Sequence, residues 1–495
     1  MADSLKTFSP TDAWQPLPAT QWDEAAARHL LQRIGFSATP AETARALLAG
    51  PAATLDRYFA TIPAFPKPRL IAALEDDTPA LARRLGGRDP VQKRLAGQDA
   101  RERSREALAD LTIKWLAHAA RPEISPAEKW LFFLQDVWVV GIEKVKNSAL
   151  VFQHQEIIRR FALGDAYHLA RAMSRSPAMI VYLDLQQSKA EAPNENFARE
   201  LFELFTLGEG HYTEPDIKEA ARAFTGYRQQ LGEFRFVARQ HDRGRKTVFG
   251  HSGNFDGDDV LKLVFQQPAA STFLPREMAK FYLTATPLPA DHLAVLGNWW
   301  AHEGYDLRKL IARFFASRLF FAPEFRGNFI KSPVQFYLGL LQDLDLRVAP
   351  LPRQIIGALR AMGQMPFNPP NVRGWVGGRS WINSTTLAAR RQLVQALLSP
   401  LNRDSLNGDE LLELDLAAVN GATNFTLDPT RLADWAALAP AKLTAQLVAT
   451  ALPGRRDAEL ERQISAFLAQ SPAQKPAAVR AALATLLESP DYQLC

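Results

Sequence analysis

The sequence contains almost no cysteine: its single one is Cys495, the last of 495 residues. An intramolecular disulfide and a structural zinc site made of cysteines are therefore excluded, and a thiol at the chain end is expected to be mobile rather than catalytic. No uninterrupted apolar run reaches the length of about 18 residues that a membrane-spanning helix needs. The first residues lack a basic region followed by an apolar one, so we expect a cytoplasmic protein, with export by association left open.

An excess of charge of one sign is also missing. The chain has 58 Lys and Arg residues against 53 Asp and Glu residues, and basic residues alternate with acidic ones, as in RERSRE at residues 101–106. Because no basic stripe interleaves with aromatic residues, we expect no nucleic-acid binding. Walker loops, dinucleotide fingerprints, HExxH motifs and GxSxG motifs do not occur, so the sequence names no cofactor and predicts no metal site.

Helical periodicity dominates the pattern that is present. It predicts a mainly α fold, a multi-helical and bundle-like body. Between residues 226 and 250, apolar and polar residues alternate around an Asp-Arg-Gly sequence, which predicts a small β-hairpin near residues 230–250. We expect a main helical domain over residues 1–400 and a C-terminal helical region, rich in Ala and Leu, over residues 401–495 that packs on it.

Residues 193–227, PNENFARELFELFTLGEGHYTEPDIKEAARAFTGY, carry the most specific pattern and are called the signature segment below. Apolar side chains of residues 196–207 fall on one arc, which predicts an amphipathic helix capped by Asn194 or Glu195. Glycines follow this helix, and a Thr-Glu-Pro-Asp sequence then opens a second one. The segment is therefore predicted to form two helices joined by a glycine-containing turn that carries His211.

The polar arc of the first helix allows two interpretations. Asn196, Glu200 and Glu203 are spaced i, i+4 and i+7, so their side chains can converge on a cation or a polar ligand, with Arg199 between them. Alternatively, Arg199 pairs with Glu195 and Glu203 at i±4, and the arc is a ladder of structural ion pairs. Such ladders are the commoner arrangement, so we favour the second interpretation.

The signature segment resembles that of a large bacterial protein family, domain of unknown function 1800. The resemblance covers essentially the whole chain and implies membership of a family whose activity is not established. Its members are often encoded beside a sulfatase-like family, domain of unknown function 1501, which implies such a protein as the partner. Further stretches similar to motifs of the family are residues 29–42, 174–184, 241–260, 325–336 and 368–391, and the ending LLESPDYQLC.

One stretch departs from the family pattern. Relatives often carry a His-Asn-His element on the helix formed here by residues 129–140, whereas this chain has Gln135, Asp136 and Val137. Neutral imidazoles are good ligands for transition metals, and glutamine and valine are not. The difference argues against carrying over any metal role of that histidine pair.

Residues 241–246 supply a second set of candidates. His241 stands beside Asp242, so the imidazole can act as a general base next to a carboxylate. Lys246, close to Arg245, can receive an anionic ligand. Alternatively, the side chains of His241 and Asp242 diverge, and the basic residues belong to a solvated turn.

The loop over residues 368–381 supplies a third set. It is rich in Pro and Gly and contains Asn371, Arg373, Trp375 and Trp381. Such residues suit carbohydrate stacking or a protein interface when a loop presents them to solvent. Alternatively, the two tryptophans fill the core.

Two classes of function follow. In one, the chain is a hydrolytic or polysaccharide-directed enzyme; in the other, it is a helical scaffold or accessory protein of the sulfatase-like partner. We favour the accessory role, because no established catalytic geometry is recognisable. The placement of the polar residues distinguishes the two classes. An enzyme gathers these residues in a concave pocket, whereas a scaffold pairs each one with a neighbour. The site predicted for the enzyme combines Asn194, Asn196, Glu200, Glu203, His211, His241, Asp242 and Arg373.

Overall fold

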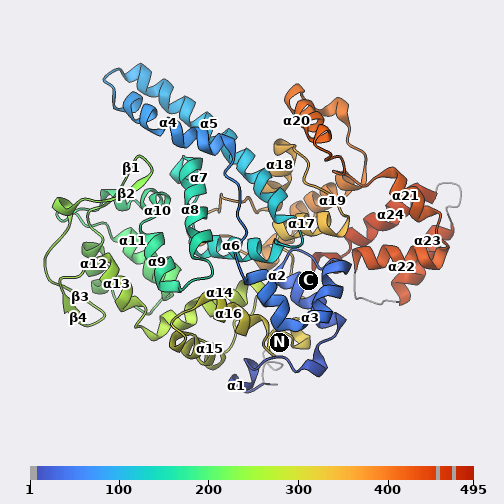
Figure 1. The fold of residues 1–495 in the computed structure, drawn as a ribbon, viewed down its shortest axis with the longest axis horizontal. Coiled ribbons are helices and arrows are strands. Elements are labelled where there is room, and N and C mark those ends of the chain that lie inside the picture. Colours follow the sequence, from blue (N-terminus) through green and yellow to red (C-terminus); the bar gives the residue numbers. More distant parts are fainter. Residues whose placement is uncertain (1–7, 453–457, 471–474) are drawn as a thin grey trace.

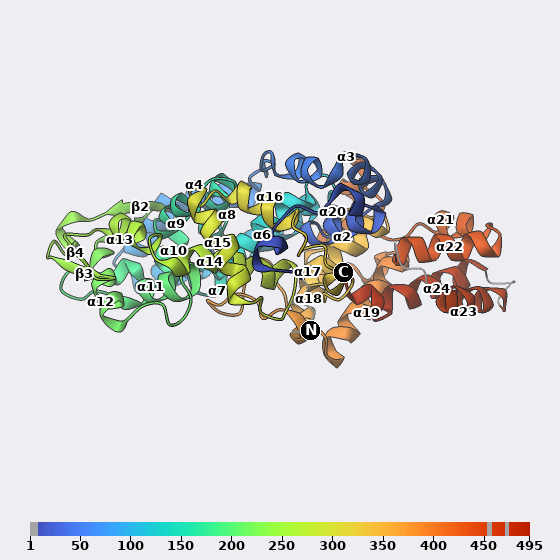
Figure 2. The same ribbon diagram turned by 90° about the horizontal axis from the view of Figure 1, so that it is seen from below.

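The computed structural model describes residues 8–452, 458–470 and 475–495. The protein is mainly α, as predicted, and is elongated (Figures 1 and 2). Within the described residues, no helix is long and apolar enough to cross a membrane. The first part of the chain forms α1 (Pro10–Ala13), α2 (Glu24–Ile34), α3 (Pro40–Phe59), α4 (Arg69–Gly86), α5 (Pro90–Ala119), α6 (Ser125–Val137), α7 (Ile142–Val145), α8 (Ser148–Phe161), α9 (Ala166–Ser174) and α10 (Pro177–Tyr182).

The middle of the chain contains the strands. It forms α11 (Glu195–Glu200), α12 (Glu214–Ala223), β1 (Tyr227–Gln230), β2 (Glu233–Phe236), β3 (Lys246–Val248), β4 (His251–Gly253), α13 (Gly257–Val264), α14 (Pro268–Tyr282), α15 (Ala290–His302), α16 (Leu307–Phe315), α17 (Pro333–Asp343) and α18 (Pro352–Met362). The last part forms α19 (Ser384–Leu398), α20 (Gly408–Val419), α21 (Pro429–Ala436), α22 (Pro440–Ala451), α23 (Ala458–Ala469) and α24 (Lys475–Glu488).

The elements spread from the strands at one end to the C-terminal helices at the other. In Figure 1 the strands lie with α12 and α13 at one end, α21 to α24 lie at the opposite end, and α4 and α5 project as a pair from the body. The predicted division into residues 1–400 and 401–495 stays a prediction.

Helices α6 and α17 form the centre of the hydrophobic core. Both are apolar on most sides, so nearly all of their residues are buried. Aromatic rings extend this core toward the loop after α18. The ring of Phe132 on α6 lies 5.2 Å from that of Trp115 on α5 and 5.2 Å from that of Trp375 in the loop. This stack fixes the loop against two long helices.

Two hairpins replace the single one predicted near residues 230–250. β1 pairs antiparallel with β2, and β3 pairs antiparallel with β4. Their loops, Leu231-Gly232 and Phe249-Gly250, have positive φ at both positions, as type I′ turns require. The Asp-Arg-Gly sequence is not a hairpin turn and lies in the segment that connects the two hairpins.

The end of the chain is buried, so the expectation of a mobile terminal thiol is wrong. The backbone N–H of Cys495 donates to the carbonyl of Phe329 at 2.9 Å, and the N–H of Phe329 donates back at 3.2 Å. The side chain of Cys495 is 3% exposed. This short bridge fixes the chain end to the segment before α17 and removes the thiol from solvent.

Candidate functional site

The signature segment forms the predicted pair of helices, with one local difference. Asn194 caps α11 by accepting from the N–H of Asn196, and Thr213 and Asp216 form a capping box at the start of α12. The second half of the predicted first helix, Leu201–Thr206, is a π-helix. This wider turn is frequent at functional sites.

Arg199 joins the two helices of the signature segment. Its guanidinium donates to both carboxylate oxygens of Glu214, at 2.7 and 2.8 Å, and more weakly to Glu195 at 3.4 Å. The hydrogen bond to Glu214 raises the pKa of Arg199. The predicted pair with Glu195 is therefore present, while Glu203 lies in the π-helix and is held by other partners. Arg199 serves the architecture of the site.

Glu203 connects the signature segment to the loop that follows α18. Its Oε1 accepts from Nη2 of Arg373 at 2.7 Å, and its Oε2 accepts from the Tyr212 hydroxyl at 2.8 Å. Arg373 also donates to Glu209 at 2.9 Å, and its backbone N–H donates to the Asn371 side chain at 2.8 Å. Two predicted site residues far apart in the sequence are thus brought into contact.

A pocket of about 420 Å³ lies beside this contact, between α11, α7 and the loop after α18. Asn196 and Glu200 line it from the signature segment, and Glu143, Tyr182 and Asn368 line it from other elements, together with two loop prolines. We call it the signature pocket. The two predicted positions on α11 therefore lie in a concave site rather than on a flat, solvated helix face.

The polar groups of the signature pocket include acceptors that lack a partner. Within the described residues, no hydrogen bond or ion pair holds the Glu200 carboxylate, and Oδ1 of Asn368 is buried without a partner. Asn196 donates its amide to the carbonyl of Leu183 at 3.2 Å, and no residue that the structure describes donates to its side-chain oxygen. Burial, followed by the charge of Glu203, raises the pKa of Glu200.

The charge balance of the signature pocket is negative. Glu143 and Glu200 contribute carboxylates to its wall. The ammonium of Lys144, which also lines it, forms an ion pair with Asp184 at 2.5 Å. The paired cation offers little attraction to an anion, so the pocket suits a neutral or cationic ligand with several hydrogen-bond donors.

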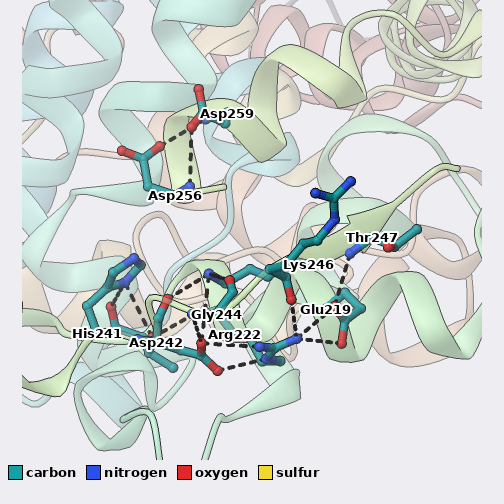
Figure 3. Close-up of polar contacts among 11 residues, drawn as sticks. Glu219, Arg222, His241, Asp242, Gly244, Lys246, Thr247, Asp256 and Asp259 are labelled. Atoms are coloured by element: carbon teal, nitrogen blue, oxygen red, sulfur yellow. Dashed lines mark hydrogen bonds and ion pairs between the residues drawn. The ribbon is translucent and has the colours of Figure 1, made fainter. Parts of the chain in front are cut away.

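The second set of candidates, in the segment between the hairpins, is shown in Figure 3. Nδ1 of His241 donates to the carbonyl of Thr225 at 3.0 Å. The Asp242 carboxylate instead accepts from the guanidinium of Arg222, at 2.7 and 3.2 Å. His241 and Asp242 each bind a different neighbour, so they are not brought together as a catalytic pair.

Lys246 is a buried structural cation. Its side chain is 1% exposed and donates to the carbonyls of Asp242, at 2.6 Å, and Gly244, at 3.1 Å. Burial lowers its pKa, although the charge of Asp242 acts in the opposite direction. Glu219 on α12 accepts from both Arg222 and the N–H of Thr247 (Figure 3). The network ties the second hairpin to α12 and leaves little capacity for an external anion.

The other predicted residues are divided between surface and core. His211 is exposed in the turn before α12 and does not line the signature pocket. Trp375 and Trp381 are 6% and 8% exposed, as in the alternative in which they fill the core. The backbone N–H of Trp375 donates to Oδ1 of Asp136 at 2.9 Å, which fixes the loop that carries Arg373.

Comparison with known proteins supports one assignment. A family model described as "Protein of unknown function (DUF1800)" matches residues 29–494. The chain belongs to the DUF1800 family. No curated protein and no solved structure gives a significant match to it. The DUF1800 description assigns no activity, so the function of this member rests on the geometry of its site.

Sequence reasoning missed three wall residues of the signature pocket in this DUF1800 protein. Tyr182 and Asn368 both lie in stretches that resemble family motifs, which was a usable signal. Glu143 had no signal, because it lies on a one-turn helix outside every motif. All three reach the pocket through the packing of α7 and α10 and through the course of the loop after α18.

Proposed function

We propose that the protein binds a carbohydrate in the signature pocket and acts as a polysaccharide-directed enzyme. The observation that supports this proposal is the group of unpartnered acceptors formed by Glu200, Asn196 and Asn368. Sugar hydroxyls donate hydrogen bonds to such oxygens. Oδ1 of Asn368 is the buried one of these acceptors. A buried acceptor without a partner costs about 1–3 kcal/mol, and a bound hydroxyl removes that cost.

The apolar part of the wall supports the same class of ligand. Tyr182, Pro369 and Pro370 line the signature pocket together with the acceptors. Aromatic and proline rings contact the C–H faces of sugar rings, while the hydroxyls at the ring edge reach polar groups. A few placed polar groups within an apolar wall are typical of small-molecule sites.

Two carboxyl groups in the same wall support hydrolysis over passive binding. Glycoside hydrolysis uses a pair of carboxyl groups, one protonated acid and one carboxylate. Burial and the charge of Glu203 raise the pKa of Glu200, and a raised pKa is the direction that a general acid needs. Glu143 lines the same pocket, so the wall supplies a second carboxyl group.

The test is saccharide binding by calorimetry, followed by assay for released reducing ends. Glu200→Gln keeps the size of the side chain and removes its charge, so we expect an affinity loss of about 10- to 100-fold with folding retained. Glu195→Gln is the matched control. Glu195 lies on the same helix, pairs with Arg199 and does not line the pocket.

Two results would contradict the proposal. One is a wild-type protein that binds no member of a broad panel of neutral and acidic oligosaccharides. The other is a Glu200→Gln variant that binds and turns over saccharide as the wild type does, while its thermal midpoint is also unchanged.

A second proposal is the accessory role beside a sulfatase-like protein of the domain of unknown function 1501 family. It draws support from the locally paired charges of the signature segment and of the second hairpin, such as Arg199 with Glu214 and Arg222 with Asp242. Affinity purification from the source cells tests it. Stoichiometric recovery of such a partner would support the accessory role, and recovery of the protein alone would count against it.

A further inference from the structure

A second pocket, of about 320 Å³, adjoins the signature pocket and has the opposite charge. It lies between α5, α7 and α18, and Figure 1 shows α5 running between the other two helices. Its wall contains four cationic side chains, and we call it the basic pocket. The four are Arg101, Arg105, Lys146 and Arg360.

These four cations are free of competing partners. Within the described residues, none of their side chains forms a hydrogen bond or an ion pair, and all four residues are exposed. Arg222 and Arg159 show the contrast, since each is held by carboxylates of its own fold. An anion that enters the basic pocket therefore meets several charges without displacing an internal partner.

The two pockets share part of their walls. Glu143 and Asn368 line both of them. Asn368, whose buried Oδ1 has no partner among the described residues, therefore lies at the junction. The Glu143 carboxylate repels an anion at the junction, so an anionic group is best placed toward α5 and α18. Because the two walls meet, we expect a ligand longer than one sugar unit to extend from one pocket into the other.

We propose that the polysaccharide is anionic, with one unit in the signature pocket and the carboxylate or sulfate of a neighbouring unit in the basic pocket. This inference rests on the proposed carbohydrate site. It gives the ligand a direction, because the acceptors of Glu200 and Asn196 take hydroxyls at one end and the arginines take the anion at the other.

The composition of both walls favours such a saccharide over a nucleic acid. Single-stranded nucleic acids are held by a continuous basic groove with aromatic side chains on which bases stack. The wall of the basic pocket contains no aromatic side chain among the described residues, and the adjoining pocket carries carboxylates that repel phosphates. A saccharide that is mostly neutral and carries one anionic group fits a negatively charged pocket followed by a positively charged one.

The experiment measures the affinity of the full chain for matched neutral, uronic-acid and sulfated oligosaccharides at several salt concentrations. The wild type should prefer the anionic members by about 10-fold or more at low salt, with the preference falling as salt rises. The double variant Arg105→Gln with Arg360→Gln should lose this preference and keep its affinity for the neutral oligosaccharide. Comparison of the uronic and sulfated members identifies the anion.

A matched control comes from the same two helices. Arg94 on α5 and Arg353 on α18 are exposed, have no ion pair within the described residues and do not line the basic pocket. The control variant Arg94→Gln with Arg353→Gln removes the same net charge and should keep the anionic preference.

The outcomes separate this inference from the proposed function. Equal wild-type affinity for neutral and anionic oligosaccharides overturns the inference and leaves the carbohydrate site standing. Loss of preference in the control variant as well overturns it, since net charge then accounts for the effect. Absence of all saccharide binding overturns both proposals. Tight binding of a single-stranded oligonucleotide that is lost in the Arg105 and Arg360 variant assigns the basic pocket to nucleic acid instead.

Discussion

Asp136 carries a charge whose cost to the fold can be measured. It lies on α6, and its carboxylate accepts from the backbone N–H of Trp375 at 2.9 Å. Burial raises its pKa to about 7, with a smaller contribution from the charge of Glu277, against the lowering effects of that N–H and of Lys280. The same carboxylate fixes the loop that forms one wall of the signature pocket.

The sign of the effect follows from the direction of the pKa change. Below about pH 4 Asp136 is protonated in both the folded and the unfolded chain, and it adds no cost. Between about pH 4 and 7 the unfolded chain loses the proton while the folded chain keeps it, so the free energy of unfolding falls as pH rises. Above about pH 7 Asp136 is ionised in both the folded and the unfolded chain, and the full reduction in the free energy of unfolding persists. A rise of about three pKa units corresponds to about 4 kcal/mol.

Asp136→Asn removes this cost and keeps an oxygen that can accept from Trp375. We expect the variant to match the wild type near pH 4 and to become more stable with rising pH, by up to about 4 kcal/mol near pH 8. Urea denaturation of both proteins across this range measures the difference. Asp415→Asn, at an exposed ion pair with Arg403, is the control. A difference between Asp136→Asn and wild type that does not grow with pH would refute the reasoning.

Two further predictions concern local structure. Gly374→Ala should destabilise the protein by about 2–3 kcal/mol more than Gly378→Ala, as measured by urea denaturation. Both glycines have positive φ, but only at Gly374 does an added Cβ lie 2.1 Å from Oδ1 of Asp136. Equal losses would contradict the clash. Lys246→Met should cost about 2–4 kcal/mol, because two carbonyls lose a buried donor, while saccharide affinity stays unchanged. The control is Arg245→Met at the exposed neighbouring position, which should change the free energy of unfolding by less than about 0.5 kcal/mol. Loss of saccharide binding in Lys246→Met but not in Arg245→Met would instead show that Lys246 belongs to the binding site.

Local rules predicted the helix ends well. Asn194 as a cap and the Thr213–Asp216 start of α12 were readable because capping depends on residues within one turn. The hairpins were harder. Their turns use Leu231 and Phe249 before glycine, without the Asn-Gly or Asp-Gly signal, while Asp242 mimicked a turn residue and is held by an arginine from α12.

The local helix rules could not predict contacts between residues that are far apart in the sequence. Helix spacing offered Glu203 as a partner for Arg199, but the π-helix and the approach of Arg373, 170 positions further on, gave Glu203 other partners. From the sequence alone, the aromatic ring of Trp375 could equally stack on a ligand or fill the core. Only the stack with Phe132 decides that its ring belongs to the interior.

The contrast between paired and unpaired charges is the basis for the proposed site within the signature segment. Arg199 and Lys246 satisfy their donors within the fold, so stability accounts for them. Glu200 and Asn368 do not, since a half-buried carboxyl with a raised pKa and an orphaned amide oxygen both weaken the fold. Polar groups that lack a partner and weaken the fold are expected at the sites where proteins bind ligands. Their meeting in one pocket, beside arginines that form no ion pair with any described residue, is the observation on which the two proposals rest.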